Sequence, residues 1–191
     1  MKKNRILWLT QLAMLTAIVL LLQMLPLAVG PMQLAAFALI PIVVGGAMLG
    51  VGAGVWLGLV FSLVVLFGPD TLAYFMPVSA VGTVVTILAR GLLAGAAGGL
   101  VYKALQKRNT WAAMICAAAA VPVVNTGVFV LGLRVFFWPL MQEWAGGGSA
   151  VAFVFLTMIG ANFLIELAAT VIISTALLPV VRRLAASRSR L

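Results

Sequence analysis

Residues 80–108 read AVGTVVTILARGLLAGAAGGLVYKALQKR, and this stretch decides the fold. Its apolar run exceeds the roughly 20 residues that a helix needs to cross a bilayer. Arg90 interrupts the run, and Lys103, Lys107 and Arg108 end it. Membrane proteins retain Lys and Arg on the cytoplasmic side. The stretch therefore predicts a transmembrane helix whose C-terminal end lies in the cytoplasm.

Two further basic clusters lie at the ends of the chain. One comprises Lys2, Lys3 and Arg5, and the other Arg182, Arg183, Arg188 and Arg190. The breaks between apolar runs at the opposite side carry acidic residues instead, Asp70 and Glu143. Three basic clusters on one side require an even number of crossings between each pair. We therefore expect both termini to be cytoplasmic.

Composition excludes a water-soluble domain. The chain has 191 residues, of which 65% are hydrophobic and 8% are charged, whereas soluble domains carry about 25% charged residues. The net charge of +9 would suggest nucleic acid in a soluble protein, but these charges flank apolar spans, so no nucleic-acid partner is expected. One cysteine and no histidine offer neither a disulfide framework nor a metal site.

The pattern predicts an all-α membrane protein, a compact bundle of six transmembrane helices in one domain spanning residues 1–191. The first apolar run is too long for a typical signal peptide, so we expect it to be retained. Segments 71–79 and 139–149 are expected to be outer loops, and residues after 184 a frayed tail. The predicted helices span about residues 6–25, 33–49, 55–67, 80–105, 110–138 and 150–178, followed by a basic tail at 182–191.

Polar residues inside apolar spans mark a candidate binding site. Arg90, Asn125, Asn162 and Glu166 lie far from the predicted helix ends, and Arg134 lies closer to one. An ionised side chain at mid-bilayer costs roughly 2.5–3.5 kcal/mol, so such residues usually face a cavity or a partner. Asn162 and Glu166, four residues apart, share one helix face. We expect a hydrophilic pocket that opens outward.

The loops would close this pocket with aromatic side chains, Tyr74 from one loop and the 138–144 segment from another. Structural alternatives remain for each polar residue. Arg90 and Glu166 could form a purely structural ion pair, and Arg134 could extend to the interface beside Trp138. The two asparagines could hydrogen-bond neighbouring helices.

Catalysis is not expected, and neither is a cofactor. Without histidine there is no imidazole base, and the three carboxylates lie in distant segments. No nucleophile has an activating partner visible in the sequence. There is no Walker motif, so any ATP-derived energy would come from another protein.

Several motifs occur together in a recognisable order. An A-x-x-x-A pattern at Ala13 and Ala17 would let another helix approach closely. It is followed by a Gly-rich stretch at 38–58, by LARGLLAG at 88–95, by VNTG at 124–127 and by NFLIE at 162–166. In this order on six helices, they resemble the substrate-binding S component of energy-coupling factor (ECF) transporters. The resemblance covers residues 10–183.

The resemblance implies high-affinity capture of a vitamin or metal ion at the outer face of a prokaryotic plasma membrane. The S component docks onto a transmembrane T component with two ABC ATPases, topples in the membrane and releases its cargo inside. Ala13 and Ala17 would contact the T component. The substrate-binding residues would be Tyr74, Arg90, Asn125, Arg134, Asn162 and Glu166.

The cargo expected from the resemblance is a vitamin of the riboflavin, folate and pantothenate group. The absence of histidine disfavours cobalt or nickel. Arg90 and Arg134 favour an anionic vitamin such as pantothenate or folate, although Glu166 would neutralise part of that charge. Two other hypotheses remain, a stand-alone small-solute carrier or channel and a membrane scaffold without a ligand.

Overall fold

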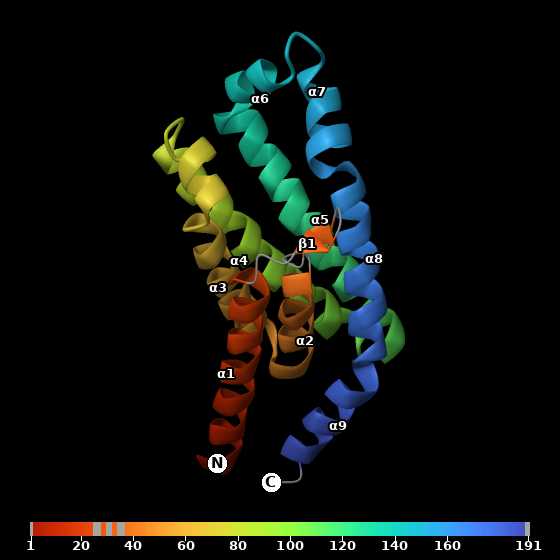
Figure 1. Ribbon diagram of the computed structural model, residues 1–191. Helices are drawn as coiled ribbons and strands as arrows, with labels where there is room; N and C mark the ends of the chain where they lie inside the picture. The colour runs from red at the N-terminus through yellow and green to blue at the C-terminus, as the bar shows by residue number, and fades with distance from the viewer. Residues whose placement is uncertain (1, 25–27, 30–31, 34–36, 190–191) are drawn as a thin grey trace.

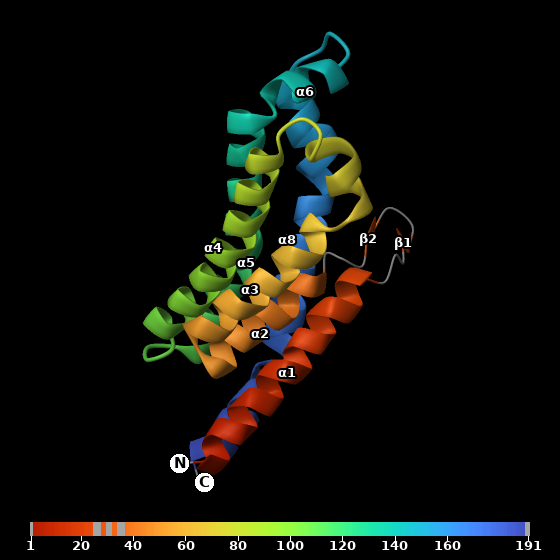
Figure 2. The ribbon, with the colours of Figure 1, turned by 90° about the vertical axis from the view of Figure 1, so that its left-hand side faces the viewer.

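The computed structural model describes residues 2–24, 28–29, 32–33 and 37–189, which form a bundle of helices with one short pair of strands (Figure 1). The start of α1 and the helix α9 lie at the same end of the molecule (Figure 2). The elements, in chain order, are α1 (Lys2–Met24), β1 (Ala28–Val29), β2 (Met32–Gln33), α2 (Leu39–Leu49), α3 (Val51–Leu66), η2 (Thr71–Phe75), α4 (Ala80–Leu105), α5 (Thr110–Phe136), α6 (Trp138–Trp144), α7 (Ala150–Ala152), η3 (Phe153–Gly160), α8 (Ala161–Ala176) and α9 (Leu178–Ser189).

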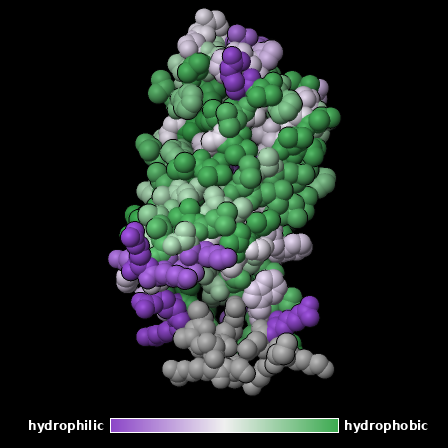
Figure 3. Space-filling model, turned by 180° about the vertical axis from the view of Figure 1, so that it is seen from behind, coloured by the Kyte–Doolittle hydropathy of each residue, from purple (hydrophilic) through white to green (hydrophobic). Residues whose placement is uncertain are grey.

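Four helical segments are long and apolar enough to cross a membrane: Arg5–Met24, α4, α5 and the continuous stretch Ala150–Ala176. The helices α2 and α3 are apolar but shorter. On the face seen in Figure 3, hydrophobic side chains form a broad belt between hydrophilic groups near the two ends of the molecule. The chain is thus a multi-pass membrane bundle, while the six crossings and the cytoplasmic termini stay predictions.

The predicted starts of the second and third helices are wrong. Met32–Gln33 pairs with Ala28–Val29 as an antiparallel ladder, so these residues cannot begin a helix at 33, and α2 begins at Leu39. The third helix begins at Val51 instead of 55, because Gly50 reverses the chain in one residue with a φ of 98°. Only glycine adopts such a φ readily.

Two segments predicted as outer loops contain helical turns. The segment 71–79 includes the π-helix η2, whose Thr71 hydroxyl donates to the carbonyl of Val65 at 2.7 Å. The segment 139–149 begins within α6, where Pro139 occupies the first turn, a position that tolerates a missing N–H. Both turns lie at the end of the bundle opposite α9 (Figure 1).

The last predicted helix and the basic tail also differ from expectation. The stretch predicted as one α-helix over 150–178 contains a π-helical segment, η3, between α7 and α8. The tail predicted to be frayed is helical as far as Ser189. Pro179 lies in the first turn of α9, where its missing N–H costs no intrahelical hydrogen bond, so a new helix can begin there.

Helices α3 and α4 pack with their backbones in contact at four glycines. A Cβ added to Gly58 would collide with the carbonyl of Gly91, and one added to Gly95 would collide with the carbonyl of Gly54. One turn further along α3, the Ser62 hydroxyl donates to the carbonyl of Ile87 at 2.7 Å. We call Gly54, Gly58, Gly91 and Gly95 the glycine seam. It fixes how closely α4 approaches α3.

Replacing Gly91 by valine should destabilise the bundle by about 2 kcal/mol or more, because overpacking a close contact typically costs 1–3 kcal/mol and the contact here is backbone. The control is Gly127→Ala in α5, where an added Cβ meets no atom within 4 Å. Thermal unfolding of the purified protein in detergent measures both. Equal midpoints for the two variants would show that the seam does not limit packing.

Candidate functional site

Helix α4 carries Arg90 into the middle of the bundle. Arg90 lies ten residues after Ala80, about 15 Å along the helix at 1.5 Å per residue. Its Nε donates to Oδ1 of Asn125 in α5 at 3.0 Å. Arg90 is half-buried, whereas Asn125 is 2% exposed. A polar contact thus joins α4 and α5 at mid-span, where the surrounding helices are apolar.

Two aromatic rings hold the guanidinium group. The Cζ of Arg90 lies 4.8 Å from the ring centre of Phe129 in α5 and 5.6 Å from that of Phe61 in α3. Cations at such distances from an aromatic face are attracted to the ring, more strongly when they are desolvated. Phe129 is four residues after Asn125 and so shares its helix face. The position of Arg90 is therefore set from both α3 and α5.

Helix α8 contributes a buried polar face on the opposite side. Glu166 is 9% exposed. Thr170 and Ser174, four and eight residues later on the same face, are fully buried. Among the described residues, neither hydroxyl has a hydrogen-bond partner. Buried polar groups are usually satisfied, so this face has capacity for further hydrogen bonds.

A cluster of aromatic side chains connects Arg90 to the end of the bundle. Phe75 of η2 makes edge-to-face contacts with Phe129, Phe137 and Trp144, at centroid distances of 6.2, 5.2 and 6.2 Å. Tyr74 meets Trp144 edge to face at 5.7 Å. The two predicted loop segments, represented by η2 and α6, therefore touch each other above Phe129.

Helix α1 presents an unpartnered face. One side packs on the bundle, where the Trp8 indole donates to the carbonyl of Leu49 at 3.1 Å and that of Trp56 donates to the Thr16 hydroxyl at 3.2 Å. Ala13 and Ala17 lie on the other side and are exposed. Small exposed residues one turn apart leave room for a second helix to approach closely.

A comparison with models of known protein families identifies the family of this chain. The family model described as "ECF transporter, substrate-specific component" matches residues 8–178. The chain belongs to this family. It has no significant match among curated proteins or among solved structures. Members of the family are membrane transport subunits that bind a small-molecule substrate and associate with T component and ATPase modules.

The structure of this S component joins two of the six predicted substrate-binding residues, Arg90 and Asn125, by a hydrogen bond. Glu166 is buried on α8. In the described part of the chain, the other four predicted residues are not among the hydrogen-bond or ion-pair partners of Arg90. Arg134 is exposed and lies over the Trp138 ring at 4.6 Å. Asn162 is exposed, although it shares a helix face with Glu166, and Tyr74 is 54% exposed beside Trp144. Their roles stay predictions.

Sequence reasoning missed Phe61 and Phe129, which lie beside Arg90, and Phe75, which contacts Phe129. Phenylalanine is common in apolar spans, so none of the three stands out by type. The spacing of Phe129 from Asn125 could have indicated it, since both lie on one face of α5. In the part of the chain that the structure describes, no three His, Cys, Asp or Glu side chains gather as metal ligands.

The contact between Arg90 and Asn125 should be measurable as a coupling. Asn125→Ala should destabilise the S component by about 1–3 kcal/mol, because it leaves a buried donor unsatisfied. In a double-mutant cycle with Arg90→Gln, the interaction energy should lie between about 0.5 and 3 kcal/mol. Chemical unfolding in mixed micelles provides the four free energies.

The matched control for this cycle is Arg134→Gln combined with Asn125→Ala. Arg134 is exposed and stacks on Trp138, so its effect should add to that of Asn125→Ala within about 0.5 kcal/mol. A coupling for Arg90 and Asn125 no larger than this control would mean that their hydrogen bond is not maintained in the bilayer protein.

Proposed function

We propose that this S component captures a water-soluble vitamin bearing a carboxylate, such as pantothenate or folate, at the outer face of a prokaryotic plasma membrane. It then delivers the vitamin to a T component with two ABC ATPases, which drive import. The observation that carries the proposal is Arg90. Its guanidinium is fixed at mid-span by Asn125, Phe61 and Phe129.

Arg90 has donors to offer a ligand. Guanidinium groups carry five N–H donors and bind carboxylates through two parallel hydrogen bonds. Within the described residues, Asn125 is the hydrogen-bond partner of Arg90 and uses Nε, so both Nη groups are available. An arginine at this depth is costly unless it serves an anion or a partner. A ligand carboxylate would supply that anion.

The aromatic cluster supports the same proposal. Ligand sites are mostly apolar with a few polar groups that fix orientation. Here Phe129 supplies flat apolar surface next to Arg90, and Phe75 and Trp144 extend that surface toward the end of the bundle. Both η2 and α6 lie at the end of the bundle opposite the basic clusters. A ligand that enters between them would come from outside the cell if Lys and Arg mark the cytoplasmic side.

Native mass spectrometry of the purified S component should reveal the retained vitamin by its mass. Arg90→Gln should weaken the affinity for that vitamin about 10- to 100-fold, which corresponds to losing one charge-assisted interaction. Arg108→Gln, at the basic end of α4, is the control and should bind normally. Unchanged affinity in Arg90→Gln would move the binding site away from Arg90.

Docking should be separable from binding. Trp at both Ala13 and Ala17 should abolish uptake by the complete transporter in vesicles, because the bulky side chains block close approach of a helix. Vitamin binding by the isolated subunit should persist. The control is Leu100→Trp, which places a Trp side chain at another exposed apolar position, on α4.

The stand-alone carrier hypothesis gives a different result in the same vesicles. If the chain alone transported the vitamin without T component or ATP, it would act as a carrier or channel, and the proposed role as a capture subunit would be wrong.

A further inference from the structure

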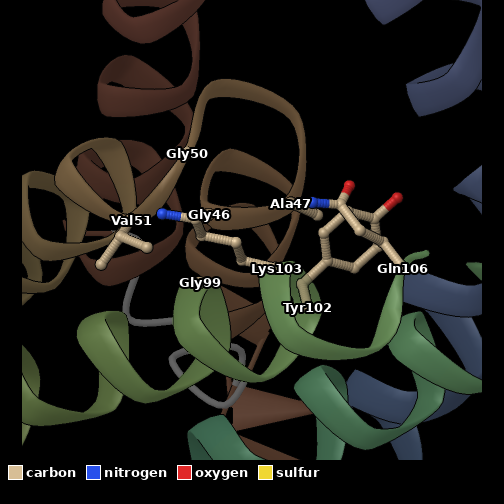
Figure 4. Close-up of a pocket in the computed structure, with 8 residues that line it drawn as sticks. All are labelled: Gly46, Ala47, Gly50, Val51, Gly99, Tyr102, Lys103 and Gln106. Atoms are coloured by element: carbon tan, nitrogen blue, oxygen red, sulfur yellow. The ribbon is translucent and has the colours of Figure 1, made fainter. Parts of the chain in front are cut away.

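A cavity of about 300 Å³ lies at the end of α4 that carries Lys103. Figure 4 shows the residues that line it. The cavity opens between the turn that joins α2 to α3 and the last turns of α4. We call it the basic-end cavity. Its lining residues are Gly46, Ala47, Gly50, Val51, Gly99, Tyr102, Lys103 and Gln106.

The glycines that line this cavity shape it in two ways. A Cβ on Gly46 would lie 3.2 Å from the backbone of Gly99, and one on Gly99 would lie 2.8 Å from the Cα of Val51. The three helices therefore meet closely at the floor. At Gly50, by contrast, an added Cβ would meet nothing within 4 Å, so the turn leaves open space above that floor.

Three polar side chains that can donate hydrogen bonds line the cavity, those of Tyr102, Lys103 and Gln106. Tyr102 is 6% exposed, and its phenol has no hydrogen-bond partner among the described residues. Lys103 and Gln106 are exposed, and Figure 4 shows Lys103 extending toward the turn at Val51. That turn is also the N-terminus of α3, which has no side-chain cap. Uncapped N–H groups at a helix N-terminus favour an anion.

The surrounding charge is entirely positive. Arg182 of α9 acts electrostatically on Tyr102, and Lys107 and Arg108 follow Lys103 in the sequence. The three acidic side chains of the whole sequence are Asp70, Glu143 and Glu166. The first two lie at the other end of the bundle and the third lies at mid-span, so no carboxylate side chain neutralises this end.

The Trp8 side chain lies close to the turn that borders the cavity. The Trp8 indole donates to the carbonyl of Leu49, the residue before Gly50, and tryptophan concentrates at membrane interfaces. Leu100 follows Gly99 and is 56% exposed, so apolar surface that suits acyl chains borders the cavity. A phosphate-bearing anion can reach these donors from the membrane surface or from solution.

We propose that the basic-end cavity binds a phosphate-bearing anion through Lys103, the Tyr102 phenol and the N-terminal N–H groups of α3. This site is separate from the Arg90 site and does not depend on the identity of the vitamin. Lys103 supplies the charge, as lysine commonly does at phosphate sites, and Tyr102 supplies a directional donor from the buried side.

Native mass spectrometry of the full chain, titrated with short-chain phosphatidylglycerol, tests the proposal. Lys103→Gln should weaken binding about 10-fold, the equivalent of roughly 1.4 kcal/mol, and Tyr102→Phe should weaken it by about half that free energy or more. Lys107→Gln is the matched control, because Lys107 is exposed at the same end but does not line the cavity. It should bind as the wild type does.

A parallel titration with glycerol 3-phosphate distinguishes the two sources of the anion. If only phosphatidylglycerol saturates the site, the bound anion is a lipid headgroup. If glycerol 3-phosphate saturates it equally well, the bound anion is a soluble phosphate ester. Equal losses in Lys103→Gln and Lys107→Gln would indicate diffuse attraction and overturn the site. The proposal would also be overturned if Lys103→Gln bound the phosphate compounds normally but assembled less well with the T component. That result would mean that the cavity receives an acidic group of a protein.

Discussion

Backbone contact between α3 and α4 at the glycine seam is the constraint on which the rest of the structure depends. Gly91 is the neighbour of Arg90, and Phe61 follows Gly58 by three residues on the facing helix. Side chains at the seam would push α4 away from α3 and carry Arg90 away from the Phe61 ring. Small residues drive such contacts in membranes, where the hydrophobic effect between helices is absent. The seam therefore positions the polar centre as well as the helices.

Helix α2 explains how short apolar helices fit this bundle. Ten of its eleven residues are buried, as expected for a helix that is hydrophobic on all sides. Its neighbours are α1, α3, α4, α5, α8 and α9. At eleven residues this helix is about 16 Å long, which is shorter than the four membrane-length helical segments of the bundle. The basic-end cavity lies at the Gly50 turn that ends this helix, so the same short helix that fills the core also leaves space at its end.

The sequence was informative where one physical signal dominated. The apolar run and basic end of residues 80–108 predicted α4 with its observed bounds, and mid-span polarity led to Arg90, Asn125 and Glu166. The predicted start of α2 was wrong because the two-residue ladder of β1 with β2 depends on strand pairing that no local sequence pattern encodes. Phe75 and Phe129 were missed because their contacts depend on which faces of distant helices meet, whereas Trp144 belongs to the 138–144 segment that was expected beside the pocket. Burial also separated Asn162 from Glu166, which periodicity alone had placed together.

The contacts around Tyr74 bear on how a ligand would reach Arg90 under the proposed function. Two edge-to-face pairs, Tyr74 with Trp144 and Phe75 with Trp144, hold η2 against α6. Such pairs contribute about 0.5–1.5 kcal/mol each beyond the burial of their apolar area, so the ring geometry of these two pairs adds about 1–3 kcal/mol to the cost of separating the segments. Entry would then require no unfolding of α4 or α5, because the seam and the hydrogen bond between Arg90 and Asn125 lie below the separating segments. Ring contacts re-formed around a bound ligand would offset the cost of opening and retain the ligand.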